Sequence, residues 1–98
     1  FTWPTPAFGG AVGCCHALDI PFAFDNLSAP GTDMLTGDGA ERAGIATRFA
    51  DEIAQFAKSS APSWPAFDLA DRSTLEINAE IAVLSDPEKE IREIYLSL

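Results

Sequence analysis

The stretch DGAERAGIATRFADEIAQFAK, residues 38–58, is the longest regular pattern in the chain and defines its largest element. Its large apolar residues recur every three or four positions, which places them on one face of an α-helix. These residues are Ile45, Phe49, Ile53 and Phe56. Asp38 followed three residues later by Glu41 has the form of a capping box, which marks a helix start. Because two serines and Pro62 end the pattern, the spacing predicts a helix over 39–58.

A hairpin and a second helix are predicted after this element. Apolar and polar residues alternate over 72–78, and residues 81–84 are apolar and partly β-branched, which predicts a hairpin over 72–85 with its turn at 78–80. Pro87 follows Asp86 at a position where its missing N–H costs a helix nothing. Apolar residues then recur on one face, so we expect a C-terminal helix over 87–98. Those residues are Ile91, Ile94, Tyr95 and Leu98.

The segment before the long helix is less regular. Phe1 to Trp3 are strand-like residue types, and Pro4 stops them because proline cannot donate to a sheet ladder. We expect residues 1–24 to form this leading strand and a loop carrying His16, with a short helix or turn over 18–24. Residues 25–37 are rich in Asn, Ser, Pro and Gly and predict a surface loop. The chain as a whole, 1–98, is expected to be one mixed α+β unit, mainly helical.

Composition narrows the function classes. The chain has 98 residues, of which 47% are hydrophobic and 21% charged, as in a globular domain. A net charge of −9 with no basic cluster argues against nucleic acid and anionic membranes as partners. No apolar run approaches the roughly 20 residues that span a bilayer. The only cysteines, Cys14 and Cys15, are adjacent and cannot form a disulfide framework. A reducing, cytoplasmic location is therefore expected, with secretion of a parent protein left open.

His16 is the only histidine and the first candidate for chemistry. A lone histidine is usually structural. This one follows two small residues on a predicted loop and has Asp19 three positions later, which suits a rigidly held general base. Cys14 or Cys15 acting as a nucleophile beside it is an alternative, and small packing residues a simpler one. The contiguous Cys-Cys-His side chains diverge, so we expect neither a metal site nor a cofactor.

The stretch from Gly13 to Phe24, GCCHALDIPFAF, resembles a segment of the type-B carboxylesterases, α/β-hydrolases that include para-nitrobenzyl esterases and cholinesterases. That segment has the form Gly-x-x-His-x-x-acidic-apolar-x-Phe-x-Phe. Further fragments that fall in the family's order are Phe56-Ala57, Pro62, 64–68, 72–75 and Asp86-Pro87. Three positions depart from it, with Ser60, Phe67 and Leu75 standing where Gly, Tyr and Met are common.

The resemblance implies a C-terminal α/β-hydrolase segment in which His16 is the general base and acid of a Ser–Glu/Asp–His triad acting on a small carboxylic ester. In that fold the histidine comes last of the three in chain order. The resemblance also makes Asp19 a candidate to orient His16, or to cap the next turn, and Phe22 and Phe24 candidates to line an acyl pocket, or to pack in the core. No Gly-x-Ser-x-Gly and no His-Gly-Gly-Gly sequence occurs. We therefore expect the chain to need the remainder of a parent polypeptide and to be inactive alone.

Two other hypotheses remain open at this point. The chain could be a non-catalytic, esterase-like binding module, or a free-standing acidic protein whose His16 is structural. Because the chain opens on Phe1 without an initiator Met, we expect a processed or truncated product. A piece of a larger domain leaves apolar surface uncovered, and we expect it to self-associate.

Overall fold

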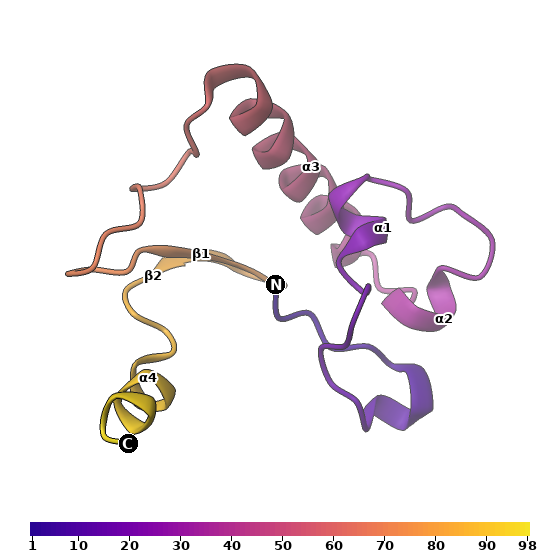
Figure 1. Ribbon diagram of the computed structural model, residues 1–98. Helices are drawn as coiled ribbons and strands as arrows, with labels where there is room; N and C mark the ends of the chain where they lie inside the picture. Colours follow the sequence, from indigo (N-terminus) through magenta and orange to yellow (C-terminus); the bar gives the residue numbers. More distant parts are fainter.

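The computed structural model describes all 98 residues as a mainly helical chain with one small sheet. In chain order its elements are η1 (Ala7–Gly10), α1 (Ile20–Ala23), α2 (Asp33–Thr36), α3 (Glu41–Ser59), β1 (Thr74–Ile77), β2 (Ile81–Leu84) and α4 (Lys89–Leu96). Figure 1 shows α1 beside α3, the hairpin near the N-terminus, and α4 apart from the other helices. The expectation of a mixed, mainly helical chain with a hairpin is confirmed.

Helix α3 starts two residues later than the spacing predicted and has no capping box. Its N-cap is Ala40, and no side chain caps the first turn. Asp38 lies two residues before that N-cap, too early to accept from the third helical N–H. At the other end Ser60 has a left-handed backbone, with φ of 57°, and its N–H donates to the Phe56 carbonyl at 2.8 Å. This conformation favours glycine, and Ser60 adopts it with a side chain.

The hairpin pairs two antiparallel strands in the expected place. The register runs from Thr74 opposite Leu84 to Ile77 opposite Ile81. The turn covers 78–80, where the Ala79 N–H donates to the side-chain oxygen of Asn78 at 2.8 Å. Asn78 thus satisfies a turn N–H from its own side chain, the usual role of Asn in turns.

The prediction of a leading strand is wrong, because residues 1–6 belong to no strand. The Thr2 N–H does donate to the Ile77 carbonyl at 3.0 Å, and its hydroxyl donates to Glu76 at 2.9 Å. Pro4 has no N–H to continue a ladder, so the contact with β1 stops there. The prediction of a loop over 25–37 is also wrong in part, because Asp33–Thr36 form the one-turn helix α2.

The core is small and lies where α1 crosses α3. Its six members are Trp3, Leu18, Phe22, Ile45, Ala46 and Ile77. The Phe22 ring lies 5.2 Å from that of Phe1 and 5.8 Å from that of Trp3, centroid to centroid. The Trp3 indole N–H donates to the Thr36 carbonyl at 3.0 Å, which satisfies its polar group inside the core.

Charged side chains join α4 to the two ends of the hairpin. Asp86 accepts hydrogen bonds from Arg92, and the Arg72 Nε lies 3.8 Å from its Oδ1. The Arg92 guanidinium, above all, holds the pKa of Asp86 below its usual value. This cluster connects the start of β1, the end of β2 and α4, while no residue of α4 is buried. The helix begins at Lys89 rather than at Pro87.

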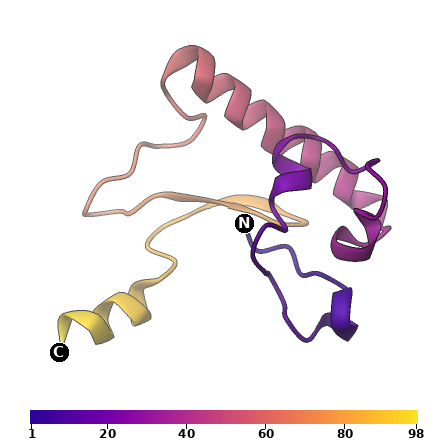
Figure 2. The same ribbon diagram turned by 45° about the vertical axis from the view of Figure 1, so that its right-hand side comes forward.

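The chain is open in shape. Its radius of gyration is 15.2 Å, against about 13 Å for a compact domain of this length. Only nine residues are buried. Figure 2 shows α4 reaching away from the hairpin and from α3. The helices include none that is both long and apolar enough to cross a membrane.

Candidate functional site

His16 lies on a turn between the η1 loop and α1, with its side chain exposed. On one side Cys15 packs against the core, and on the other Leu18 is fully buried. The Leu18 N–H donates to the Cys15 carbonyl at 3.3 Å, and the Ile20 N–H donates to the Ala17 carbonyl at 3.3 Å. The backbone of the turn is therefore held by its neighbours while the imidazole faces outward.

The backbone beside His16 is strained. Ala17 has a φ of 65°, in the left-handed region, which costs an L-residue other than glycine about 1 kcal/mol or more. Such residues persist where the surrounding structure holds them, and they concentrate at functional sites. Burial of Leu18, the next residue, supplies that hold here.

No residue of the chain forms a hydrogen bond with the His16 imidazole. Asp19 occupies the N-cap position of α1, and its main-chain oxygen accepts from the Ala23 N–H at 2.8 Å. Its carboxylate neither caps that helix nor bonds to His16. The Cys14 thiol donates instead to the Phe1 carbonyl at 3.1 Å. Both ring nitrogens are thus free to bond with groups from outside this chain.

The two phenylalanines considered as pocket residues have different surroundings. Phe22 is 0% exposed and packs in the core, so in this chain it contacts no open pocket. Phe24 is 78% exposed and, with Pro21, Asn26 and other residues, lines a shallow groove of about 560 Å³. Only Phe24 is placed to meet a bound molecule.

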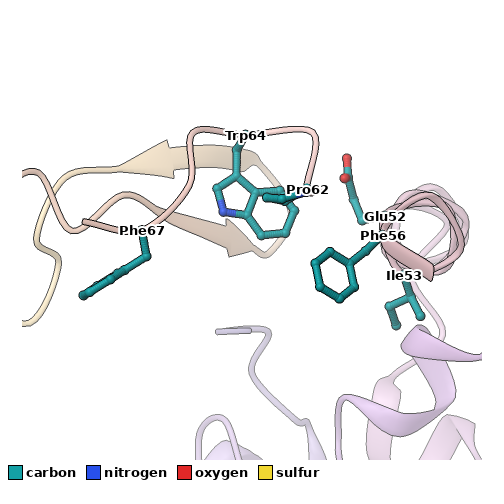
Figure 3. Close-up of a pocket in the computed structure, with 6 residues that line it drawn as sticks. All are labelled: Glu52, Ile53, Phe56, Pro62, Trp64 and Phe67. Atoms are coloured by element: carbon teal, nitrogen blue, oxygen red, sulfur yellow. The ribbon is translucent and has the colours of Figure 1, made fainter. Parts of the chain in front are cut away.

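A second feature is a cleft between the C-terminal half of α3 and the segment that follows it (Figure 3). Its volume is about 430 Å³, and it is lined by Glu52, Ile53, Phe56, Pro62, Trp64 and Phe67. Glu52 is its only charged residue. Our sequence reasoning did not identify this site, although Glu52 lies three positions after Phe49 and seven after Ile45, on the apolar face of the helix.

Glu52 is a covered carboxylate with one oxygen bonded and one not. Its side chain is 6% exposed, and Arg48 donates to Oε1 from Nε at 2.7 Å. Oε2 is buried and has no hydrogen-bond partner. The nearby Ser63 hydroxyl, first, and then Arg48 lower the pKa of Glu52, while burial opposes them. The Ser63 backbone N–H contributes to the lower pKa as well, so the group is an ionised carboxylate.

These features can be set beside known proteins. No protein-family profile matches the chain. The para-nitrobenzyl esterase of Bacillus subtilis strain 168 is 36% identical over 94 residues, in an alignment covering 80% of this chain and 17% of that protein. A solved para-nitrobenzyl esterase superposes on 95% of this chain and 20% of its own with a TM-score of 0.79 at 28% identity. The chain matches one segment of a para-nitrobenzyl-esterase-type carboxylesterase.

A carboxylesterase from Geobacillus stearothermophilus gives a similar result, with a TM-score of 0.75 at 28% identity over 93% of this chain. This chain spans no more than about a fifth of the length of these relatives. Within it no three His, Cys, Asp or Glu residues are grouped closely enough to hold a metal ion.

Proposed function

We propose that this chain is the histidine-bearing, C-terminal segment of a serine carboxylesterase with the α/β-hydrolase fold, and that His16 is its general base and acid. One observation carries the proposal. The chain is similar to an esterase segment, and its only imidazole is exposed on a fixed, strained turn with no partner of its own. A proton-transfer group in a multi-part site must be held in place and left open to its partners.

In the assembled enzyme a serine hydroxyl supplied by the rest of the polypeptide attacks the ester carbonyl. One ring nitrogen of His16 accepts the serine proton and then delivers it to the departing alkoxide, leaving an acyl-enzyme. His16 next takes a proton from water as the water oxygen attacks the acyl carbon, and it returns that proton to the serine oxygen as the acid is released. The other ring nitrogen donates to a carboxylate of the same remainder, which fixes the tautomer. The exposed position of the ring leaves both nitrogens accessible for these bonds.

The isolated chain lacks the nucleophile and the oxyanion donors, so we expect it to be inactive. None of its serines lies in a Gly-x-Ser-x-Gly sequence. With para-nitrophenyl acetate it should give no more rate than free imidazole at the same concentration. A saturable, inhibitor-sensitive rate from this chain alone would contradict the expectation.

The proposal is tested by exchanging this chain for the corresponding segment of the Bacillus subtilis para-nitrobenzyl esterase. The chimera should hydrolyse para-nitrophenyl esters, and His16→Ala should lower kcat by about 10⁴-fold or more. Asp38→Asn is the matched control, because Asp38 is exposed before α3 and lies outside the groove beside Phe24.

Far-UV circular dichroism of each variant shows whether the chimera has folded. A folded His16→Ala chimera that keeps its rate would refute the catalytic role and favour a binding module. Equal losses in the Asp38→Asn control would show that the loss is not specific to the imidazole, which would also refute the role.

A further inference from the structure

We infer that Thr5 is a positioning residue for His16, because it fixes the point at which the chain enters the His16 turn. The inference rests on the proposed function, since it assigns Thr5 a part in the same reaction. Thr5 is 1% exposed, whereas Pro4 and Pro6 on either side of it are exposed. The two prolines restrict the backbone on both sides, so the segment is stiff around a single buried polar residue.

The Thr5 hydroxyl anchors this segment on α2. It donates to the Leu35 carbonyl at 2.6 Å and accepts from the Ala7 N–H at 3.1 Å. Two residues earlier, the Trp3 indole N–H donates to the Thr36 carbonyl at 3.0 Å. Two alternate side chains therefore hold the segment against the C-terminal end of α2, and the direction of the Thr5 N–H is set by these bonds.

The Thr5 backbone holds the start of the His16 turn. Its N–H donates to the Gly13 carbonyl at 3.0 Å, and in Figures 1 and 2 the chain returns close to its first residues before it enters α1. Gly13 has a φ of 56°, which glycine adopts without steric cost, so this residue does not fix its own direction. The bond from Thr5 supplies the constraint, three residues before His16.

The His16 turn is thus held from two ends, by Thr5 before it and by the buried Leu18 after it. His16 forms no hydrogen bond within the chain, so the backbone alone determines where its ring lies. A general base displaced by about 1 Å from its partners loses on the order of 100-fold in rate. Thr5 is buried and does not contact an ester, and it acts on the reaction through the position of the imidazole.

Three substitutions separate this role from a general effect on stability. Thr5→Val keeps the side-chain shape and the backbone N–H but removes the hydroxyl, and Thr5→Ser restores the hydroxyl. Thr36→Val is the matched control. Thr36 is 0% exposed, and its hydroxyl donates to the Thr32 carbonyl at 3.0 Å rather than to the His16 turn.

The first measurement is the backbone order of residues 14–17 in the full chain, from ¹⁵N relaxation. Order parameters should be about 0.8 or higher in the original chain, in Thr5→Ser and in Thr36→Val, and below about 0.6 in Thr5→Val. Equal order in Thr5→Val and the original chain overturns the inference. An equal loss of order in Thr36→Val also overturns it, because the effect would then follow from loss of any buried hydroxyl.

The second measurement is hydrolysis by the esterase chimera. Thr5→Val should lower kcat about ten-fold or more and leave KM within about two-fold, while Thr5→Ser should stay within about three-fold of the original kcat. An unchanged kcat in Thr5→Val overturns the inference, and the proposed function still stands if His16→Ala removes activity. The order measurements need no catalysis, so they decide the role of Thr5 even if the chimera shows that His16 is not the base.

If Thr5→Val does not fold, amide hydrogen exchange of the unsubstituted chain provides the test. The Thr5 N–H and the Leu18 N–H mark the two ends of the turn. Their protection factors should lie within about ten-fold of each other, because the two ends open together. A Thr5 amide that exchanges freely while that of Leu18 stays protected overturns the inference.

Discussion

Residues 1–50 and residues 60–98 differ in how far each closes its own apolar surface. Five of the six core residues lie in the first region, and only Ile77 comes from the second. Both regions carry apolar residues at regular spacing. The regularly spaced apolar residues at the C-terminus nevertheless stay exposed, and this stripe consists of Ile91, Ile94, Tyr95 and Leu98. Periodicity therefore indicates where an apolar face lies and does not indicate whether the same chain covers it.

The difference matters for function because the two candidate sites differ in how many buried residues lie behind them. The His16 turn is fixed by residues of its own region, with Leu18 and Phe22 fully buried behind it. The second region offers surfaces for neighbours, namely the cleft wall at Trp64 and Phe67 and the outer face of α4. The first region can hold a catalytic group in place, and the second is suited to contact other groups.

The largest difference in stability is expected between the substitutions Phe22→Ala and Phe24→Ala. Phe22 is fully buried against two rings, and its loss should lower the free energy of unfolding by about 3 to 5 kcal/mol. Phe24 lies two residues away and is largely exposed, so its loss should change stability by about 0.5 kcal/mol or less. Urea unfolding followed by circular dichroism measures both. Similar effects of the two substitutions would mean that the first region has no core of its own.

A smaller effect is expected from Glu52→Gln. The charge-assisted bond to Arg48 is lost, so at pH 7 the chain should be less stable by about 1 to 2 kcal/mol. Because the folded pKa of Glu52 lies below its usual 4.5, the stabilisation is present above that value and disappears as the pH falls through the folded pKa.

The difference between Glu52→Gln and the original chain should therefore vanish in acid. Urea unfolding from pH 3 to 7 measures it, with Asp51→Asn as the exposed control on the same helix. A difference that does not shrink between pH 7 and pH 3 would mean that the carboxylate's charge is not what stabilises the helix.

The smallest effect on stability is expected from Ile94→Ser combined with Leu98→Ser. Both residues are exposed, so unfolding should change by about 0.5 kcal/mol or less. We expect the uncovered stripe to drive self-association of the isolated chain, and the double substitution should reduce it in sedimentation velocity. Glu90→Gln on the same helix is the control. A chain that is monomeric without any substitution would contradict the expectation.

Much of the secondary structure could be predicted because local patterns determine it. The spacing from Ile45 to Phe56 located α3, and alternation located the hairpin, to within two residues at each end. The prediction of a capping box was wrong. Asp38 could cap a helix that starts directly after it, but the N-cap of α3 is Ala40, two residues later. The prediction of a leading strand was wrong because strand-like residues need a neighbouring strand edge to pair with. In this chain only the Thr2 backbone bonds to β1.

The two candidate sites differ in how visible they are from sequence. His16 could be singled out because it is the only imidazole and lies in a recognisable stretch. Glu52 could not be distinguished from the other acidic residues of α3 by type alone. Its position on the apolar face was a usable signal, but the burial of its carboxylate depends on where the segment over 62–67 folds back, and no local pattern specifies that.

The bonds between Thr2 and the hairpin have a kinetic consequence. Thr2 and Glu76 are 74 residues apart in sequence, and their contact closes most of the chain into a ring. The length-dependent entropy of closing such a ring costs about 4 kcal/mol, compared with about 2 kcal/mol or less for a helix turn or a short hairpin. Docking of the hairpin on the N-terminal residues should therefore be a late event in folding, after α3 and the hairpin have each formed locally.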